Sequence, residues 1–128
     1  AYCTGVGKAM LAFLDEEALD PILRQQSFHQ FTPTTLGNIT QMRAELAEIK
    51  EHGYGFDREE HEPGIICVAL PILSARGRVL GGLSVTSTTT RTNLAALEKL
   101  VPRIRQATTH IAEAAQDWRF PDQHRTTA

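Results

Sequence analysis

The stretch that most constrains the fold is Gly64–Ser87, in which two β-rich runs flank a short polar break. The first run, Ile65–Leu73, is rich in Ile, Val and Leu, and the second, Arg78–Ser87, follows Ser74-Ala75-Arg76-Gly77. Two such runs on either side of a turn that ends in Gly are typical of a β-hairpin. The sequence therefore predicts a pair of antiparallel strands here.

The register of this hairpin divides its side chains between two faces. If Leu73 faces Arg78 across the turn, then Cys67 faces Ser84 and Ile65 faces Thr86, because alternate side chains point to opposite faces of a strand. One face then carries small or hydrogen-bonding residues: Cys67, Ala69, Gly82, Ser84 and Thr86. The other is apolar: Ile66, Val68, Leu70, Leu83 and Val85. The small face is either a ligand floor or a solvent-facing surface, and its lack of Lys, Glu, Arg and Gln favours the ligand floor.

Length and charge exclude several classes of protein. The chain has 128 residues, enough for one domain with a sizeable core, and a formal net charge of −2. That charge argues against the chain alone binding a nucleic acid, which takes a clustered basic face. No apolar run approaches the roughly 20 residues that span a bilayer, so no membrane partner is expected. Two cysteines, Cys3 and Cys67, form no disulfide framework and indicate a reducing, cytoplasmic setting.

Helices are predicted before and after the hairpin. They begin after residues that can cap a helix: Thr4, Asp15, Asn38 and Asn93. The second helix is expected to break at Pro21, and Pro102 must kink or divide the last helix.

In the third helix, which ends at Gly53, the charged residues are predicted to form a solvated face: Arg43, Glu45, Glu48 and Lys50. The last has an apolar stripe: Leu94, Leu97, Val101, Ile104, Thr108 and Ile111. Without β-α-β alternation, the class is α+β with an antiparallel sheet.

Two further groups of residues could carry chemistry. Gly5-Val6-Gly7 at the first helix start offers backbone amides that favour an anion, or else allows tight packing on a neighbour. His52, His61 and Cys67 lack the close-spaced pairs of a zinc site, so no metal and no cofactor are predicted. An enzyme with Cys67 as nucleophile and His61 or His52 as base stays as an alternative.

Four stretches, taken in order, resemble the C-terminal effector-binding domain of IclR-type bacterial transcription regulators: CTGVGKAMLAFL, ELAEIKEHGYGFDREE, PGIICVALPIL and RGRVLGGLSVTS. The resemblance covers roughly residues 1–116. It implies a GAF/profilin-like fold with a curved sheet, a small organic effector, a homodimer or homotetramer, and an N-terminal winged helix-turn-helix that binds DNA. We expect that DNA-binding domain, and the helix and strands that usually open the effector domain, to lie outside this chain.

The resemblance also implies a set of effector contacts: Gly5, Val6, Asp57, Cys67, Ser84 and Thr86. We expect residues 1–117 to form the effector-binding domain and residues 118–128 a flexible tail. The expected ligand is a small carboxylate, with its negative end on the amides of Gly5–Gly7, hydroxyls donated by Ser84 and Thr86, and a ligand hydroxyl donating to Asp57. A domain that only mediates oligomerisation, with no ligand, is the blander alternative.

Overall fold

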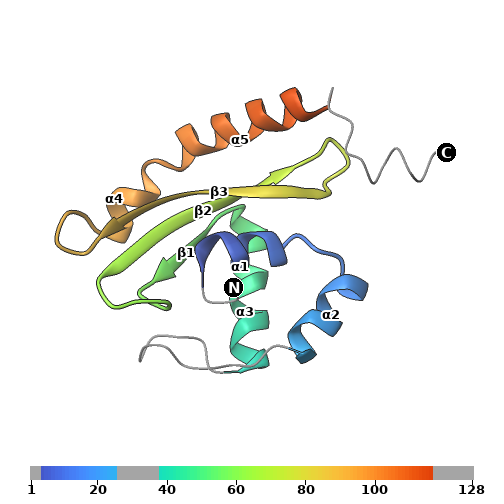
Figure 1. Cartoon of the computed structure of the whole chain (residues 1–128), viewed down its shortest axis with the longest axis horizontal. Coiled ribbons are helices and arrows are strands. Elements are labelled where there is room, and N and C mark those ends of the chain that lie inside the picture. The colour runs from blue at the N-terminus through green and yellow to red at the C-terminus, as the bar shows by residue number, and fades with distance from the viewer. Residues whose placement is uncertain (1–3, 26–37, 117–128) are drawn as a thin grey trace.

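The computed structural model describes residues 4–25 and 38–116, which form five helices and a three-stranded sheet (Figure 1). The expected α+β class is confirmed. The elements follow one another as α1 (Gly5–Leu11), α2 (Glu16–Gln25), α3 (Ile39–His52), β1 (Gly55–Arg58), β2 (Ile65–Leu73), β3 (Val79–Thr88), α4 (Leu94–Glu98) and α5 (Val101–Ala115). Cys3 and the predicted tail at 118–128 lie outside the described residues. Among those described, every helix is shorter or more polar than a bilayer-spanning segment.

The sheet is antiparallel with the order β1-β2-β3, and the predicted hairpin forms its larger part. The predicted register is wrong by two residues, because Cys67 pairs with Thr86 and Ala69 pairs with Ser84. One residue of the shift comes from the turn, since the Ser74 N–H donates to the Arg78 carbonyl at 2.8 Å.

The second residue of the shift comes from a bulge near the turn. Ile72 pairs with Gly81 but Leu73 pairs with Val79, so Leu80 is an extra residue in β3. In the turn, Gly77 adopts φ 82°, a left-handed conformation that suits glycine in a three-residue hairpin loop. Because the total shift beyond the bulge is even, the side chains of β3 from Gly81 to Thr88 keep the face that strand alternation predicts.

The apolar face of the hairpin, here called the back face, is covered by α4 and α5 (Figure 1). Its buried cluster is Ile66, Val68, Leu70, Leu97, Val101 and Ile104. Pro102 divides the last helical region as predicted, since α5 begins one residue before it and α4 ends at Glu98. The part of the predicted stripe that lies in α5 is buried at Val101, Ile104 and Thr108, whereas Ile111 is 43% exposed. The apolar spacing of α5 therefore continues further along the helix than its buried face does.

A second core lies between α2 and α3 on the other side of the sheet (Figure 1). Contrary to the prediction, α2 runs through Pro21 without a break. Leu19 and Leu23 are four residues apart on either side of this proline, and both are buried in the α2–α3 core. Burial of these two leucine side chains in a continuous helix offsets the loss of the one backbone hydrogen bond that proline cannot donate.

Candidate functional site

The face that carries the small residues, here called the front face, is approached closely by α1. The helix starts as predicted, with the Thr4 hydroxyl accepting from the Gly7 N–H at 3.1 Å. A Cβ atom at Gly5 would lie 2.3 Å from Cys67 Sγ, and one at Gly82 would lie 2.9 Å from Val6 Cγ1. Glycine on the helix and glycine on the sheet therefore both allow this contact.

The strand register sets four of the predicted effector contacts side by side. Asp57 pairs with Cys67, and Cys67 pairs with Thr86, so these three form one row across the sheet. Ser84 lies in the next row, opposite Ala69. Asp57 and Cys67 are each 5% exposed, whereas Ser84 is half-buried and Thr86 is exposed. The front face is thus closed at β1 and β2 and open towards Thr86.

The remaining two predicted contacts, Gly5 and Val6, lie at the start of α1. Gly5 packs on Cys67, and Val6 packs over Gly82. The predicted group of three free amides is wrong in part. The Gly7 N–H is bonded to Thr4, and the Gly5 N–H is directed at the Cys67 sulfur, where it favours the thiolate. Two of the three amides therefore serve the protein's own groups.

The Cys67 thiol is not activated. Burial raises the pKa of this thiol, and the nearby Asp57 carboxylate adds to the rise, although the backbone amides of Asp57 and Gly5 oppose it. His52, one of the proposed bases, lies at the C-terminus of α3 with its ring 6.0 Å from that of Tyr54. His61 is exposed in the connection between β1 and β2. A raised thiol pKa argues against a nucleophile.

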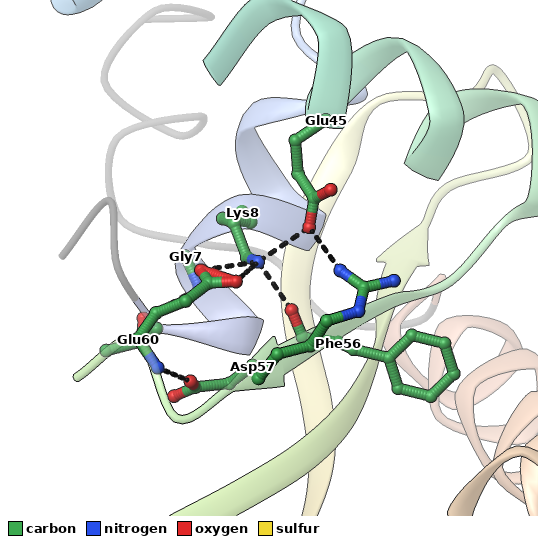
Figure 2. Close-up of polar contacts among 8 residues, drawn as sticks. Gly7, Lys8, Glu45, Phe56, Asp57 and Glu60 are labelled. Carbon is green, nitrogen blue, oxygen red and sulfur yellow. Dashed lines mark hydrogen bonds and ion pairs between the residues drawn. The ribbon is translucent and has the colours of Figure 1, made fainter. Parts of the chain in front are cut away.

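A buried lysine, Lys8 of α1, lies next to the front face and was not among the predicted site residues. The Lys8 side chain is fully buried, and its ammonium donates to both carboxylate oxygens of Glu60 at 2.7 Å and to Glu45 Oε2 at 2.8 Å (Figure 2). It also donates to the Phe56 carbonyl. One cation therefore joins α1 to α3, to β1 and to the β1–β2 connection.

This network reaches a predicted effector contact. The Glu60 N–H donates to Asp57 Oδ1 at 2.8 Å (Figure 2). Glu60 is 2% exposed, and its burial raises the pKa of its carboxyl even though Lys8 acts in the opposite direction. On the outer side, Arg58 donates to Glu45 at 3.0 Å. Glu45 therefore does not belong to a solvated face as predicted, because its side chain is only 12% exposed between two cations.

A signal for this network was present in the sequence. Lys8 is three residues after Gly5 and directly before the apolar run AMLAFL, so helical spacing places it on the packed side of α1. A buried lysine needs an anionic partner. The acidic residues between 57 and 62 supplied candidates, but nothing local indicated which of them would be buried.

The described residues offer two further facts about ligands. They contain no group of three or more His, Cys, Asp or Glu side chains that could hold a metal ion. A surface hollow of about 300 Å³ is lined by residues that include His52, Pro71 and Arg105, but by none of the six predicted effector contacts. The hydrogen-bonding side chains of Asp57, Cys67, Ser84 and Thr86 lie together on the front face instead.

Comparison with known proteins gives consistent matches. The family model "Bacterial transcriptional regulator IclR C-terminal" matches residues 1–113. The HTH-type transcriptional regulator XynR of Escherichia coli K12 is 34% identical over 113 residues, covering 88% of this chain but only 45% of XynR. The chain thus spans less than half the length of that relative.

Two solved structures illustrate the structural match. The Thermotoga maritima IclR structure has a TM-score of 0.82 at 30% identity, covering 88% of this chain and 46% of that one. The inducer-binding domain of an Acinetobacter PobR double mutant, in complex with 3-hydroxybenzoic acid, has a TM-score of 0.80 at 27% identity, covering 87% and 64%. These relatives are transcription regulators and not enzymes.

Proposed function

Because the chain belongs to the IclR family of bacterial transcriptional regulators and corresponds to its C-terminal domain, we propose that it senses a small carboxylate on its front face. The sensed signal passes to a winged helix-turn-helix domain attached upstream, within a homodimer or homotetramer in the cytoplasm. The observation that carries the proposal is the row of Asp57, Cys67 and Thr86, with Ser84 beside it and the start of α1 above it.

Each group has a role that suits a hydroxylated or oxo acid. The Ser84 and Thr86 hydroxyls, on the open side of the face, donate to the ligand carboxylate. The Asp57 carboxylate would repel that group, so it accepts instead from a ligand hydroxyl. Cys67 supplies packing and weak hydrogen bonding, in keeping with its burial. The 3-hydroxybenzoic acid bound by the related PobR domain combines the same two functional groups.

Regulation requires that the ligand bind one conformational or quaternary state better than another. The start of α1 is the place where such a difference would arise. It carries two predicted contacts, Gly5 and Val6, and it packs directly on the strands that hold the others. A ligand over Ser84 and Thr86 would therefore press on α1, which leads towards the upstream part of a longer protein.

The test is isothermal titration of this chain with 3-hydroxybenzoate and with small oxo- and hydroxy-acids. The double variant Ser84→Ala/Thr86→Val should weaken binding roughly five- to hundredfold, since each hydrogen bond contributes about 0.5–1.5 kcal/mol. Ser87→Ala is the matched control, because Ser87 pairs with Ile66 on the back face. Equal loss in both variants would overturn the assignment of the ligand to Ser84 and Thr86. No binding by the unmodified chain across the panel would leave oligomerisation as the remaining function.

A further inference from the structure

We propose that Lys8 is the positioning residue of this sensing site. Its ammonium fixes α1 and the β1–β2 connection in the arrangement that holds Gly5 and Asp57 around Cys67. The inference rests on the proposed function for its meaning, but its geometry can be tested without a ligand.

The first step is the place of Lys8 on α1. It follows Gly5 by three residues, which is about one helical turn, and both residues are buried. Gly5 is held against Cys67 Sγ with no room for a side chain. Any rotation or slide of α1 that relieved or tightened this contact would therefore move the Lys8 stem as well.

The second step is what holds the ammonium. Its acceptors come from three separate parts of the chain (Figure 2): Glu45 in α3, the Phe56 carbonyl in β1, and Glu60 after β1. They converge on a group that has no exposed surface. If the ammonium moved, these contacts would be lost where no water replaces them, which is strongly unfavourable for a buried ion pair.

The third step links the ammonium to Asp57. The carboxylate of Glu60 is bound by Lys8, while its backbone N–H donates to Asp57 Oδ1. Asp57 lies opposite Cys67 in the neighbouring strand, and its own N–H is directed at the Cys67 sulfur. Cys67 thus contacts Gly5 of α1 on one side and Asp57 of β1 on the other. The Lys8–Glu60 ion pair connects α1 to Asp57, because Lys8 belongs to α1 and the Glu60 N–H donates to Asp57.

The charges around Lys8 suggest a geometric role more than a stabilising one. Two carboxylates, those of Glu45 and Glu60, bind this one ammonium, and Arg58 balances Glu45 from outside. Burial raises the pKa of the Glu60 carboxyl, which means that its charged form is held at a cost. Apolar or neutral replacements of buried ion pairs often match or exceed their stability.

The experiment measures the rate of iodoacetamide labelling of Cys67 under native conditions, in the 128-residue chain carrying Cys3→Ser. Lys8→Met keeps the aliphatic stem and removes the charge, but it leaves Glu60 buried without its cation and is expected to destabilise the fold. The double variant Lys8→Met/Glu60→Gln neutralises both partners and should restore the thermal midpoint. It should nevertheless label Cys67 about tenfold faster, because Gly5 and Asp57 no longer close over the sulfur.

Two further variants keep the test decisive. Glu60→Gln alone retains an oxygen acceptor for Lys8, so it should increase labelling by a smaller factor and needs no rescue. Arg43→Met, which removes the exposed ion pairs of Arg43 with Glu16 and Asp20, should leave the labelling rate unchanged. Unchanged labelling in Glu60→Gln and in the double variant would overturn the role of Lys8, whether or not any carboxylate binds.

Titration with 3-hydroxybenzoate and the acid panel separates this inference from the proposed function. If the unmodified chain binds none of them, the sensing proposal fails while the labelling result still decides the role of Lys8. If it binds one, the stable double variant should bind that acid more weakly by about tenfold. Faster labelling combined with unchanged affinity would contradict Lys8 as a positioning residue for the ligand.

Discussion

The two faces of the β2–β3 hairpin are closed in opposite ways. The back face carries branched apolar side chains and is covered by α4 and α5 (Figure 1). The burial of this apolar surface stabilises the contact between the sheet and the two helices. The front face carries small residues and is covered by α1 at glycine contacts. Beneath α1 lies the fully buried charge of Lys8.

This difference indicates which face is suited to change. A packed apolar face resists deformation, because each displaced methylene group leaves a cavity. On the front face, close contact and directional charge pairs define one arrangement of α1, while Ser84 and Thr86 remain accessible. A ligand-sensing domain benefits from one face that is rigid and another whose covering helix can change position.

The largest effect on stability should come from the back face. Ile104 of α5 is 5% exposed within the back-face cluster, so Ile104→Ala should lower the free energy of unfolding by about 2–5 kcal/mol through a cavity. Urea unfolding measures this loss. Alanine is favourable in a helix, so helix propensity adds nothing to the loss of stability. A loss below about 1 kcal/mol would mean that the back face collapses around the gap and is less rigid than the comparison requires.

The next effect should come from the front face and should be steric. Gly5→Ala places a Cβ atom 2.3 Å from Cys67 Sγ, so we expect a loss of about 1–3 kcal/mol by overpacking. The second variant Cys67→Ala removes that sulfur, and the pair should recover most of the loss in a double-mutant cycle. Additive losses would show that Gly5 is needed for its backbone and not for the space above Cys67.

Glu60 should give the front face a pH dependence that Glu60→Gln lacks. Burial raises the pKa of this carboxyl above its ordinary 4.5. Between pH 4.5 and the raised pKa, the folded chain therefore binds more protons than the unfolded chain. Stability contributed by Glu60 is then complete below about pH 4.5 and is lost as the pH rises through the raised value. Lys8 opposes this rise in pKa, whereas Glu45 and Asp57 add to it.

The measurement is urea unfolding of both forms at a series of pH values. The free energy of the unmodified chain minus that of Glu60→Gln should fall with rising pH above about 4.5 and then level off. A difference that rises over this interval would mean that Lys8 lowers the pKa of Glu60 more than burial raises it. That outcome would make the pair a stabilising contact, unlike the rest of the front face.

Local signals predicted much of this fold. Thr4, Asn38 and Asn93 each cap the helix that they were expected to cap, since a cap depends on residues two or three positions away. The β2 strand has its predicted bounds, and the faces of the hairpin follow from alternation alone. Alternation did not predict the register, because the turn length and the bulge at Leu80 each add one residue that no sequence pattern marks.

Long-range contacts account for what the sequence did not predict. Lys8 lies 37 residues from Glu45 and 52 from Glu60, and charge spacing on one helix cannot show a partner so far along the chain. For that reason Glu45 resembled an ordinary solvated residue. The six effector contacts came from the family resemblance and from strand parity. Their binding role stays a prediction, although four of them share adjacent rows of the sheet.

The smallest effect should lie where the back face ends. Ile111 continues the apolar spacing of α5 but is 43% exposed, one turn beyond the buried Thr108. Ile111→Gln should therefore change the free energy of unfolding by no more than about 0.5 kcal/mol, as expected for an exposed position. Ile104→Ala, on the same helix, is the comparison. If Ile111→Gln instead lowered stability in a way that depends on protein concentration, the back face would extend through Ile111 into a contact with a second copy of the chain.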